Sequence, residues 1–200
     1  MLLEVKNLKK SFKNGRVKAV DGVSFSLEKG RTLGILGESG CGKSTLAKLV
    51  VGLLKPDEGE IIFRGKTVQI IFQQPFLSLD PRMRVKEILE EPFNISGGRM
   101  AFKPVARLLE DVGLDLQLAH RFPHELSGGE CQRIAIARAL SLDPELLVCD
   151  EAVSSLDVIS QIQILNLLLK LQVEKGMSIL FISHDPKVVR HMSDEILVMK

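Results

Sequence analysis

The fold of this chain is decided by the stretch Gly37-Glu38-Ser39-Gly40-Cys41-Gly42-Lys43-Ser44-Thr45. It fits the pattern G-x-x-x-x-G-K-[ST], and it lies between an apolar run at 32–36 and an amphipathic segment, as that pattern requires. Its glycines let consecutive backbone N–H groups converge on phosphate oxygens, and the start of the next helix adds its dipole. Lys43 can reach the β- and γ-phosphates, and Ser44 can bind Mg²⁺. The stretch therefore predicts a nucleoside triphosphate site, against the alternative of a glycine-rich turn without a ligand.

The composition is that of an ordinary globular chain of one domain. Of its 200 residues, 45% are hydrophobic and 26% are charged, and the formal net charge is only +2. This balance excludes a protein that binds nucleic acid or membranes through charge over its whole surface. No apolar stretch reaches the length of a membrane span, the N-terminus lacks the pattern of a secretory signal, and the three cysteines show no metal-binding spacing. We therefore expect a cytoplasmic chain with reduced thiols.

Apolar runs bounded by turn residues predict six strands. They lie at Arg31–Leu36, Glu60–Phe63, Val68–Phe72, Glu145–Cys149, Ser178–Ile182 and Glu195–Met199. Helical spacing of apolar residues predicts helices at Lys43–Leu54, Val85–Glu91, Pro104–Val112, Gly128–Ala139 and Ser160–Lys175. The runs at 33–36, 145–149 and 178–182 are almost continuously apolar, which is typical of a parallel sheet covered on both faces. Residues 76–141 contain helices without strong strands, so we expect a helical subdomain inserted into an α/β core.

A second candidate site is the pair Asp150-Glu151, which ends the apolar run 146–149. Two acids at the carboxyl edge of a strand can divide the chemistry of triphosphate hydrolysis. Asp150 would hold Mg²⁺ through water, and Glu151 would polarise the attacking water. The alternative is an acidic turn after a strand, but the phosphate loop favours the functional interpretation.

A third motif is Leu126-Ser127-Gly128-Gly129-Glu130, which begins the helical segment that continues to residue 140. Ser127 can cap the helix, and the two glycines expose backbone amides, so the start of the helix is suited to an anion. Taken alone, the pattern favours a capped helix without a ligand. After an α/β nucleotide core, the whole run favours an anion site.

With this motif the chain resembles, nearly end to end, the ATP-binding subunits of ATP-binding cassette (ABC) transporters, whose signature is LSGGE. Four further positions match in order and spacing: the adenine-stacking Phe12, Gln73 of the Q-loop, Asp157 of the D-loop and the switch histidine His184. Each also has an interpretation without a ligand. Phe12 could be a core residue at a strand edge and Gln73 a loop amide, while Asp157 could be a helix N-cap and His184 a surface histidine. The resemblance implies that Gln73 offers its amide to Mg²⁺ or the attacking water, and that His184 donates to the γ-phosphate or to the water network.

The resemblance implies a P-loop NTPase fold, with an α/β core of the RecA-like kind and an N-terminal antiparallel β region. The core would comprise residues 1–75 and 142–200, and residues 76–141 would form the inserted helical subdomain. Two cassettes would pack head to tail, so that residues 127–130 of one contact the ATP held by Lys43 of the other. ATP binding would then close the dimer, and loss of the γ-phosphate would open it.

The segment Phe72–Arg82 resembles the dipeptide, oligopeptide and nickel importer branch, and Ala152-Val153 after Glu151 points the same way. This resemblance implies an ATP hydrolase that powers import of a peptide or of nickel. Its partners would be two membrane-spanning permease subunits, a second ABC ATPase, identical or not, and indirectly a solute-binding protein, with no nucleic acid. The chain would be peripheral, at the cytoplasmic face of the membrane.

The chain departs from this branch in two places. Only seven residues lie between Gly65 and Gln73, and the chain ends at the strand 195–199, where the family adds a further strand and a tail. An exposed sheet edge would weaken the core, so we expect ATP binding to survive with lower stability and turnover. Two alternatives remain open: a hydrolysis-impaired or regulatory nucleotide-binding module, and a soluble ABC ATPase that acts on ribosomes or DNA.

Overall fold

The structure, a computed structural model, describes residues 1–13, 15–96 and 103–200. The strands are β1 (Leu3–Phe12), β2 (Val17–Leu27), β3 (Thr32–Gly37), β4 (Glu58–Phe63), β5 (Val68–Ile71), β6 (Leu146–Asp150), β7 (Ser178–Ser183) and β8 (Glu195–Met199). The α-helices are α1 (Lys43–Val50), α2 (Pro75–Ser78), α3 (Val85–Ile95), α4 (Val105–Asp111), α5 (Gly128–Leu140), α6 (Val158–Lys175) and α7 (Pro186–Met192). Two 3₁₀ turns, η1 (Leu116–His120) and η2 (Pro123–Glu125), precede α5.

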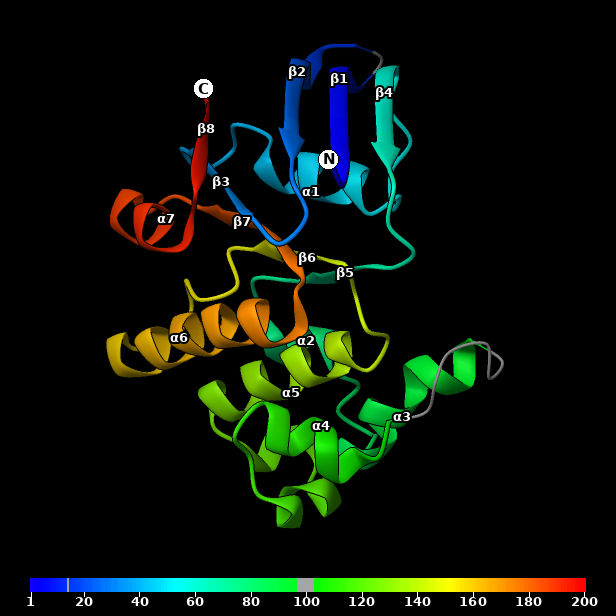
Figure 1. Cartoon of the computed structure of the whole chain (residues 1–200), viewed down its shortest axis with the longest axis vertical. Coiled ribbons are helices and arrows are strands. Elements are labelled where there is room, and N and C mark those ends of the chain that lie inside the picture. The colour runs from blue at the N-terminus through cyan, green and yellow to red at the C-terminus, as the bar shows by residue number, and fades with distance from the viewer. Residues whose placement is uncertain (14, 97–102) are drawn as a thin grey trace.

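Two sheets with α1 between them form the upper part of the molecule in Figure 1. The larger sheet is parallel and has the strand order β5-β6-β7-β3-β8, and the smaller is antiparallel with the order β2-β1-β4. Leu46 and Leu49 of α1 belong to one buried cluster with Leu3 of β1 and Leu146 of β6. The predicted α/β core and N-terminal antiparallel region are therefore confirmed.

The strand β6 shows why the parallel sheet is buried on both faces. Leu146 and Val148 pack in the cluster around α1, whereas Leu147 and Cys149 pack in a second cluster formed with α5 and α6. Successive side chains of a strand point to opposite faces, so a strand covered on both sides must be apolar throughout. Burial raises the pKa of the Cys149 thiol to about 12, which suits an unreactive space-filling side chain.

The six predicted strands are confirmed, with ends that differ by at most two residues. The five predicted helices are also present, but the prediction that the first one continues to Leu54 was wrong. It ends at Val50 because Gly52 adopts a φ of +77°, a left-handed conformation that ends an α-helix. The next predicted helix, α3, continues beyond Glu91 to Ile95.

The sequence analysis missed α7, although its start carries a recognisable signal. The carboxylate of Asp185 accepts a hydrogen bond from the backbone N–H of Lys187 at 2.8 Å, and Pro186 occupies the first turn. An Asp-Pro pair before an apolar segment is typical of a helix start. The same proline signal, Pro75, begins the short α2.

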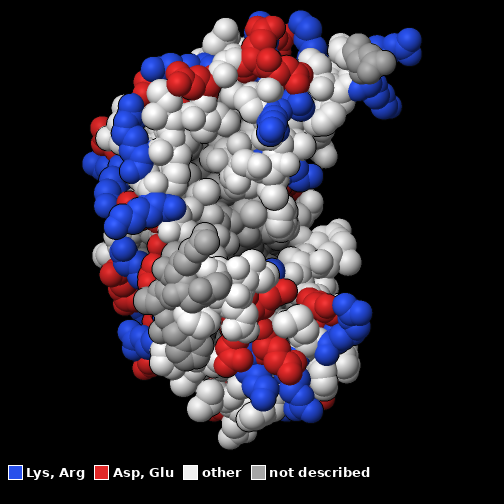
Figure 2. All heavy atoms as spheres, turned by 90° about the vertical axis from the view of Figure 1, so that its right-hand side faces the viewer, with Lys and Arg blue, Asp and Glu red and all other residues white. Residues whose placement is uncertain are grey.

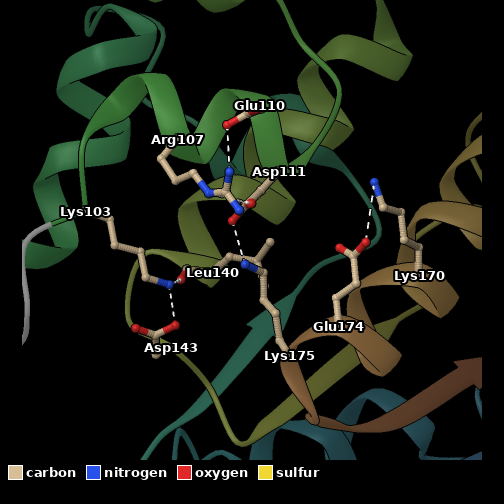
Figure 3. Close-up of polar contacts among 9 residues, drawn as sticks. All are labelled: Lys103, Arg107, Glu110, Asp111, Leu140, Asp143, Lys170, Glu174 and Lys175. Atoms are coloured by element: carbon tan, nitrogen blue, oxygen red, sulfur yellow. Dashed lines mark hydrogen bonds and ion pairs between the residues drawn. The ribbon is translucent and has the colours of Figure 1, made fainter.

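Helices α2 to α5 lie together below the parallel sheet in Figure 1, and an ion pair connects α4 to α6. Asp111 of α4 lies 2.6 Å from Lys175 of α6, between Oδ2 and Nζ, and 3.3 Å from Arg107 Nε (Figure 3). Between 76 and 141 the described residues contain helices and no strand, and residues 97–102 lie outside the described part. The division into core and helical subdomain stays a prediction. Within the described residues, no helix combines the length and apolar character needed to cross a membrane.

Candidate functional site

The predicted site residues of β3, β6 and β7 meet at one edge of the parallel sheet. The register pairs Leu36 with Ser183 and Asp150 with Ile182, so the segments that follow these strands emerge next to one another. The carboxyl ends of parallel strands are where α/β proteins form ligand crevices. A cleft of about 1150 Å³ opens here, lined by residues 36–41, Gln73, Glu151, His184, Pro186 and residues 198–200.

The phosphate loop is shaped around Gly42 and Lys43. Gly42 has a φ of +101°, and a Cβ atom there would lie 1.8 Å from the carbonyl oxygen of Ala19, so only glycine fits. Lys43 begins α1 and is 4% exposed. Its Nζ donates hydrogen bonds to the carbonyls of Gly37 and Glu38, both at 2.7 Å. The ammonium group is thus held inside the loop that is expected to surround the phosphates.

Ser44 and Asp150 form the part of the site that suits Mg²⁺. The Ser44 hydroxyl donates to the Asp150 carboxylate, with 3.1 Å between Oγ and Oδ1. Burial raises the pKa of Asp150, and the hydrogen bond from Ser44 opposes that shift. Mg²⁺ is usually held by one or two carboxylates together with substrate phosphates and water, so this oxygen pair fits the ion. Across residues 1–13, 15–96 and 103–200, no group of three or more His, Cys, Asp or Glu side chains could hold a metal ion.

Three predicted site residues converge on Glu151. Its Oε2 accepts a hydrogen bond from Gln73 Nε2 at 3.3 Å and lies 3.3 Å from His184 Nδ1. Its Oε1 lies 3.8 Å from Lys43 Nζ. Glu151 also has a φ of +50°, which costs a residue other than glycine roughly 1–2 kcal/mol. Such strain persists only where surrounding contacts hold it, and it is common at functional sites.

The structure places Gln73 with Glu151 and not with the oxygen pair of Ser44 and Asp150. The sequence analysis had Gln73 both as a ligand of Mg²⁺ and as a residue that acts on the attacking water. Its amide Nε2 is directed at the Glu151 carboxylate. Both roles stay predictions, because Mg²⁺ would be bound by the amide oxygen of Gln73, whereas this contact is made by the amide nitrogen.

Phe12 lies at the end of β1 and is not among the residues that line the cleft. It ends β1 opposite Val17, is 39% exposed, and has Lys10 Nζ at 5.9 Å from the centre of its ring. The same β-hairpin carries Ala19, which contacts Gly42. Phe12 is therefore an exposed residue of the hairpin whose second strand reaches Gly42, at the end of the phosphate loop.

The signature residues lie outside the cleft, at the start of α5. Ser127 caps this helix: its Oγ accepts from the Glu130 backbone N–H at 3.3 Å, and Glu130 Oε2 accepts from the Ser127 N–H at 2.8 Å. Gly128 and Gly129 lie against the start of α6, because added Cβ atoms would meet Leu156 and Ser160 at 3.7 and 3.3 Å. Within one chain, the structure does not bring these residues to Lys43.

Asp157 caps α6, which confirms its interpretation as a helix N-cap. Its Oδ1 accepts from the Ser160 backbone N–H at 3.0 Å, and hydrogen bonds to Ser160 lower the pKa of its carboxyl. The D-loop match also included Ser155, but the sequence analysis gave no separate role to Ser155 or to its neighbour Ser154. Ser154 Oγ donates to the carbonyl of Glu151 at 3.0 Å, and Ser155 Oγ donates to the carbonyl of Gln73 at 3.2 Å. No sequence pattern could show the second contact, since it joins distant segments.

Comparison with known proteins identifies the family. Residues 20–154 match the family described as ABC transporter. The chain belongs to this family. It is 49% identical to the "Oligopeptide transport ATP-binding protein AppF" of Bacillus subtilis (strain 168), over 99% of this chain and 69% of that protein. It is 45% identical to the "Oligopeptide transport ATP-binding protein OppF" of Escherichia coli (strain K12), over 100% of this chain and 69% of that protein.

Solved ABC cassettes have the same fold. The dimeric post-hydrolysis state of the ATP-binding cassette MJ0796, bound to ADP and Pi, superposes with a TM-score of 0.87 at 30% identity, over 100% of this chain and 94% of that one. CbiO1 from Clostridium perfringens, part of the ABC transporter complex cbiONQ, superposes with a TM-score of 0.84 at 29% identity, covering 100% and 84%. The predicted P-loop NTPase fold, family and importer branch are thus confirmed. The chain is an ATP-binding ABC cassette whose family couples ATP hydrolysis to transport.

Proposed function

We propose that this ABC cassette binds ATP with Mg²⁺ in the cleft, hydrolyses it and thereby powers the import of peptides. The convergence of Gln73, His184 and Lys43 on the Glu151 carboxylate, beside the phosphate loop, carries this proposal. The similarity to oligopeptide transport ATP-binding proteins supports the peptide class.

Each residue has a separate task. The backbone of residues 37–42 and the Lys43 ammonium hold the phosphates, once the lysine exchanges its bonds to Gly37 and Glu38 for bonds to phosphate oxygens. Ser44 and Asp150 would hold Mg²⁺, which offsets charge on the β- and γ-phosphates when it is bound. Phe12 would stack on the adenine, and its exposure at the end of β1 supports this assignment.

Glu151 orients and polarises the attacking water. Gln73 holds one carboxylate oxygen of Glu151 in place, and His184 contacts the same oxygen. His184 is also positioned at the cleft, where its other ring nitrogen is available for the γ-phosphate. The carboxylate therefore acts from a defined position, which is what the activation of a single water requires.

A second cassette completes the site. Ser127, Gly128 and Gly129 form a capped helix start outside the cleft of their own chain, and we assign them to the triphosphate bound by the partner. This arrangement makes ATP the bridge between two cassettes, as the dimeric state of MJ0796 supports. Asp157 and the start of α6, which lie beside the signature, would belong to the same interface.

Two membrane-spanning subunits would dock on the side shown in Figure 2, where an uncharged area lies at the centre of the face. An apolar groove of about 340 Å³ lies between β5, α3 and α5, and Phe72 and Ile95 are among its lining residues. Ile95 is 77% exposed, and Leu77 of the neighbouring α2 is 82% exposed. An exposed apolar area of this kind is suited to a protein partner. The cassette would then be peripheral to the membrane.

The test compares the unaltered chain with Lys43→Ala and Glu151→Gln. Hydrolysis of MgATP should be lost in Lys43→Ala and should fall at least about a hundredfold in Glu151→Gln. Glu151→Gln should form a dimer in excess MgATP, measured by light scattering. A chain that binds ATP but hydrolyses none would instead be a regulatory module. Recovery of two membrane-spanning subunits with the tagged chain from solubilised membranes supports transport, and recovery of ribosomes or DNA contradicts it.

A further inference from the structure

A hydroxyl group to which the sequence analysis gave no role links two loops of the site. Ser155 Oγ donates a hydrogen bond to the backbone carbonyl of Gln73 at 3.2 Å, although 82 residues separate them. Gln73 directs its side-chain amide to the Glu151 carboxylate at 3.3 Å. Since Ser155 lies in the turn that follows Glu151, these two hydrogen bonds and the backbone of the turn form a closed loop that includes all three residues.

The turn that carries Ser155 is held at both ends. At its start, the backbone N–H and the hydroxyl of Ser154 both donate to the carbonyl of Glu151, at 3.1 and 3.0 Å. At its end, Asp157 caps α6. The Ser155 hydroxyl therefore projects from a segment whose position is set by β6 and α6.

Gln73 has less local support. It lies between the end of β5 at Ile71 and the start of α2 at Pro75, in a segment without helix or strand, and it is exposed. Such a segment owes its position to individual contacts and not to a hydrogen-bonded ladder. The 3.3 Å separation between Gln73 and Glu151 is already long for a hydrogen bond, so a small backbone shift would break it.

We propose that Ser155 is a positioning residue for ATP hydrolysis, because its hydroxyl holds the backbone of Gln73 so that the Gln73 amide stays on Glu151. The inference rests on the proposed function, in which Glu151 activates the attacking water. Loss of the hydroxyl misaligns the carboxylate after ATP has bound, and it leaves the phosphate contacts of Lys43 in place. The rate of the bound complex therefore falls while the affinity for ATP is kept.

The experiment measures kcat and KM for MgATP in four variants of the full chain: Ser155→Ala, Ser155→Thr, Gln73→Ala and the double variant. Ser155→Ala should lower kcat about three- to tenfold, the range expected for one neutral hydrogen bond, with KM within about twofold. Ser155→Thr keeps the hydroxyl and should restore kcat. Gln73→Ala keeps the backbone carbonyl but removes the amide, so adding Ser155→Ala to it should change kcat by less than about twofold.

A matched control is Ser141→Ala, which removes a comparable hydroxyl-to-carbonyl bond, to Arg138 at 2.7 Å, from the end of α5. It should leave kcat unchanged. The positioning role is overturned if kcat is unchanged in Ser155→Ala, or if Ser155→Ala lowers kcat equally with and without the Gln73 amide. In either case the proposed function still holds, provided that the unaltered chain shows Lys43-dependent hydrolysis. If the unaltered chain shows no Lys43-dependent hydrolysis, the proposed function fails, and the role of Ser155 fails with it.

Discussion

The hydroxyl of Ser44 donates a hydrogen bond to the carboxylate of Asp150, which lies 106 residues further along the chain, with 3.1 Å between Oγ and Oδ1. One residue comes from the phosphate loop and the other from the end of β6. Their contact brings two candidate oxygen ligands of Mg²⁺ to the same point of the sheet edge. The carboxylate of Asp150 is buried, and it forms no ion pair with the described Lys, Arg and His side chains.

Asp150→Asn should raise the melting temperature of the nucleotide-free chain at pH 7. The pKa of Asp150 is raised above its ordinary value of 3.8 by burial, so ionisation costs the folded state stability once the pH exceeds that value. The gain from Asn should therefore shrink as the pH falls toward 3.8. Asp80→Asn is the opposite case, because Arg82 lowers the pKa of Asp80 to about 2. Asp80→Asn should not raise the melting temperature. Melting temperatures of both variants, measured by circular dichroism over a series of pH values, test the two predictions.

The same Asp150→Asn variant should lose the stabilisation that Mg²⁺ adds to bound ATP. A ligand that binds only the folded state raises the melting temperature by mass action, and the unaltered chain should melt at a higher temperature with MgATP than with ATP and a chelator. Asp150→Asn should show one melting temperature in both conditions. An equal Mg²⁺-dependent shift in the two chains would contradict the assignment of Asp150.

Gly42→Ala should destabilise the chain by about 3 kcal/mol or more and abolish ATP binding, because it combines left-handed strain with overpacking. The clash is with backbone, at 1.8 Å from the Ala19 carbonyl oxygen. Gly52→Ala is a matched control: its φ of +77° is also left-handed, but an added Cβ meets nothing within 4 Å. It should cost only about 1–2 kcal/mol and retain ATP binding. If urea unfolding shows that both variants lower the free energy of unfolding by the same amount, the close contact at Gly42 is contradicted.

Two inactive variants should complement each other if two copies of the chain pair head to tail. Lys43→Ala damages the phosphate loop, and Gly128→Asp places a carboxylate where the partner's γ-phosphate is expected. The structure tolerates a side chain at Gly128, since its Cβ would meet only Leu156 at 3.7 Å. A mixed dimer contains one site with both parts intact, so an equal mixture should recover about a quarter of the unaltered activity. No recovery, with both variants folded, would exclude this pairing between identical chains.

Lys175→Met should lower stability more than Lys170→Met, although both lysines lie on α6 and form ion pairs (Figure 3). Lys175 pairs with Asp111, whose side chain is 8% exposed, whereas Lys170 and its partner Glu174 are 62% and 54% exposed. Removing one partner of a largely buried pair leaves a charge without full compensation, and we expect a cost of about 1–3 kcal/mol. The exposed pair should contribute less than about 1 kcal/mol. Equal melting temperatures would contradict a connection between α4 and α6 through Asp111.

The amino-acid sequence by itself determined the six strands from β3 onward, five of the described helices, the phosphate loop and the family, whereas the ranges of β1 and β2 were not predicted. These features are local: the phosphate loop needs its glycines at fixed spacing, and a strand covered on both faces, such as Leu146–Asp150, must be apolar throughout. The order of motifs along the chain was enough to predict that Lys43, Asp150, Glu151 and His184 share one site.

Only the tertiary structure decided how these residues meet. It directed Gln73 to Glu151 and not to Ser44 and Asp150, placed Ser127 outside the cleft of its own chain, and joined Ser155 to the backbone of Gln73. Such contacts depend on sheet register and on the path of connecting loops, because segments far apart in the chain become neighbours only through strand pairing. The spacing of two residues along the sequence therefore does not predict the distance between their side chains in the fold.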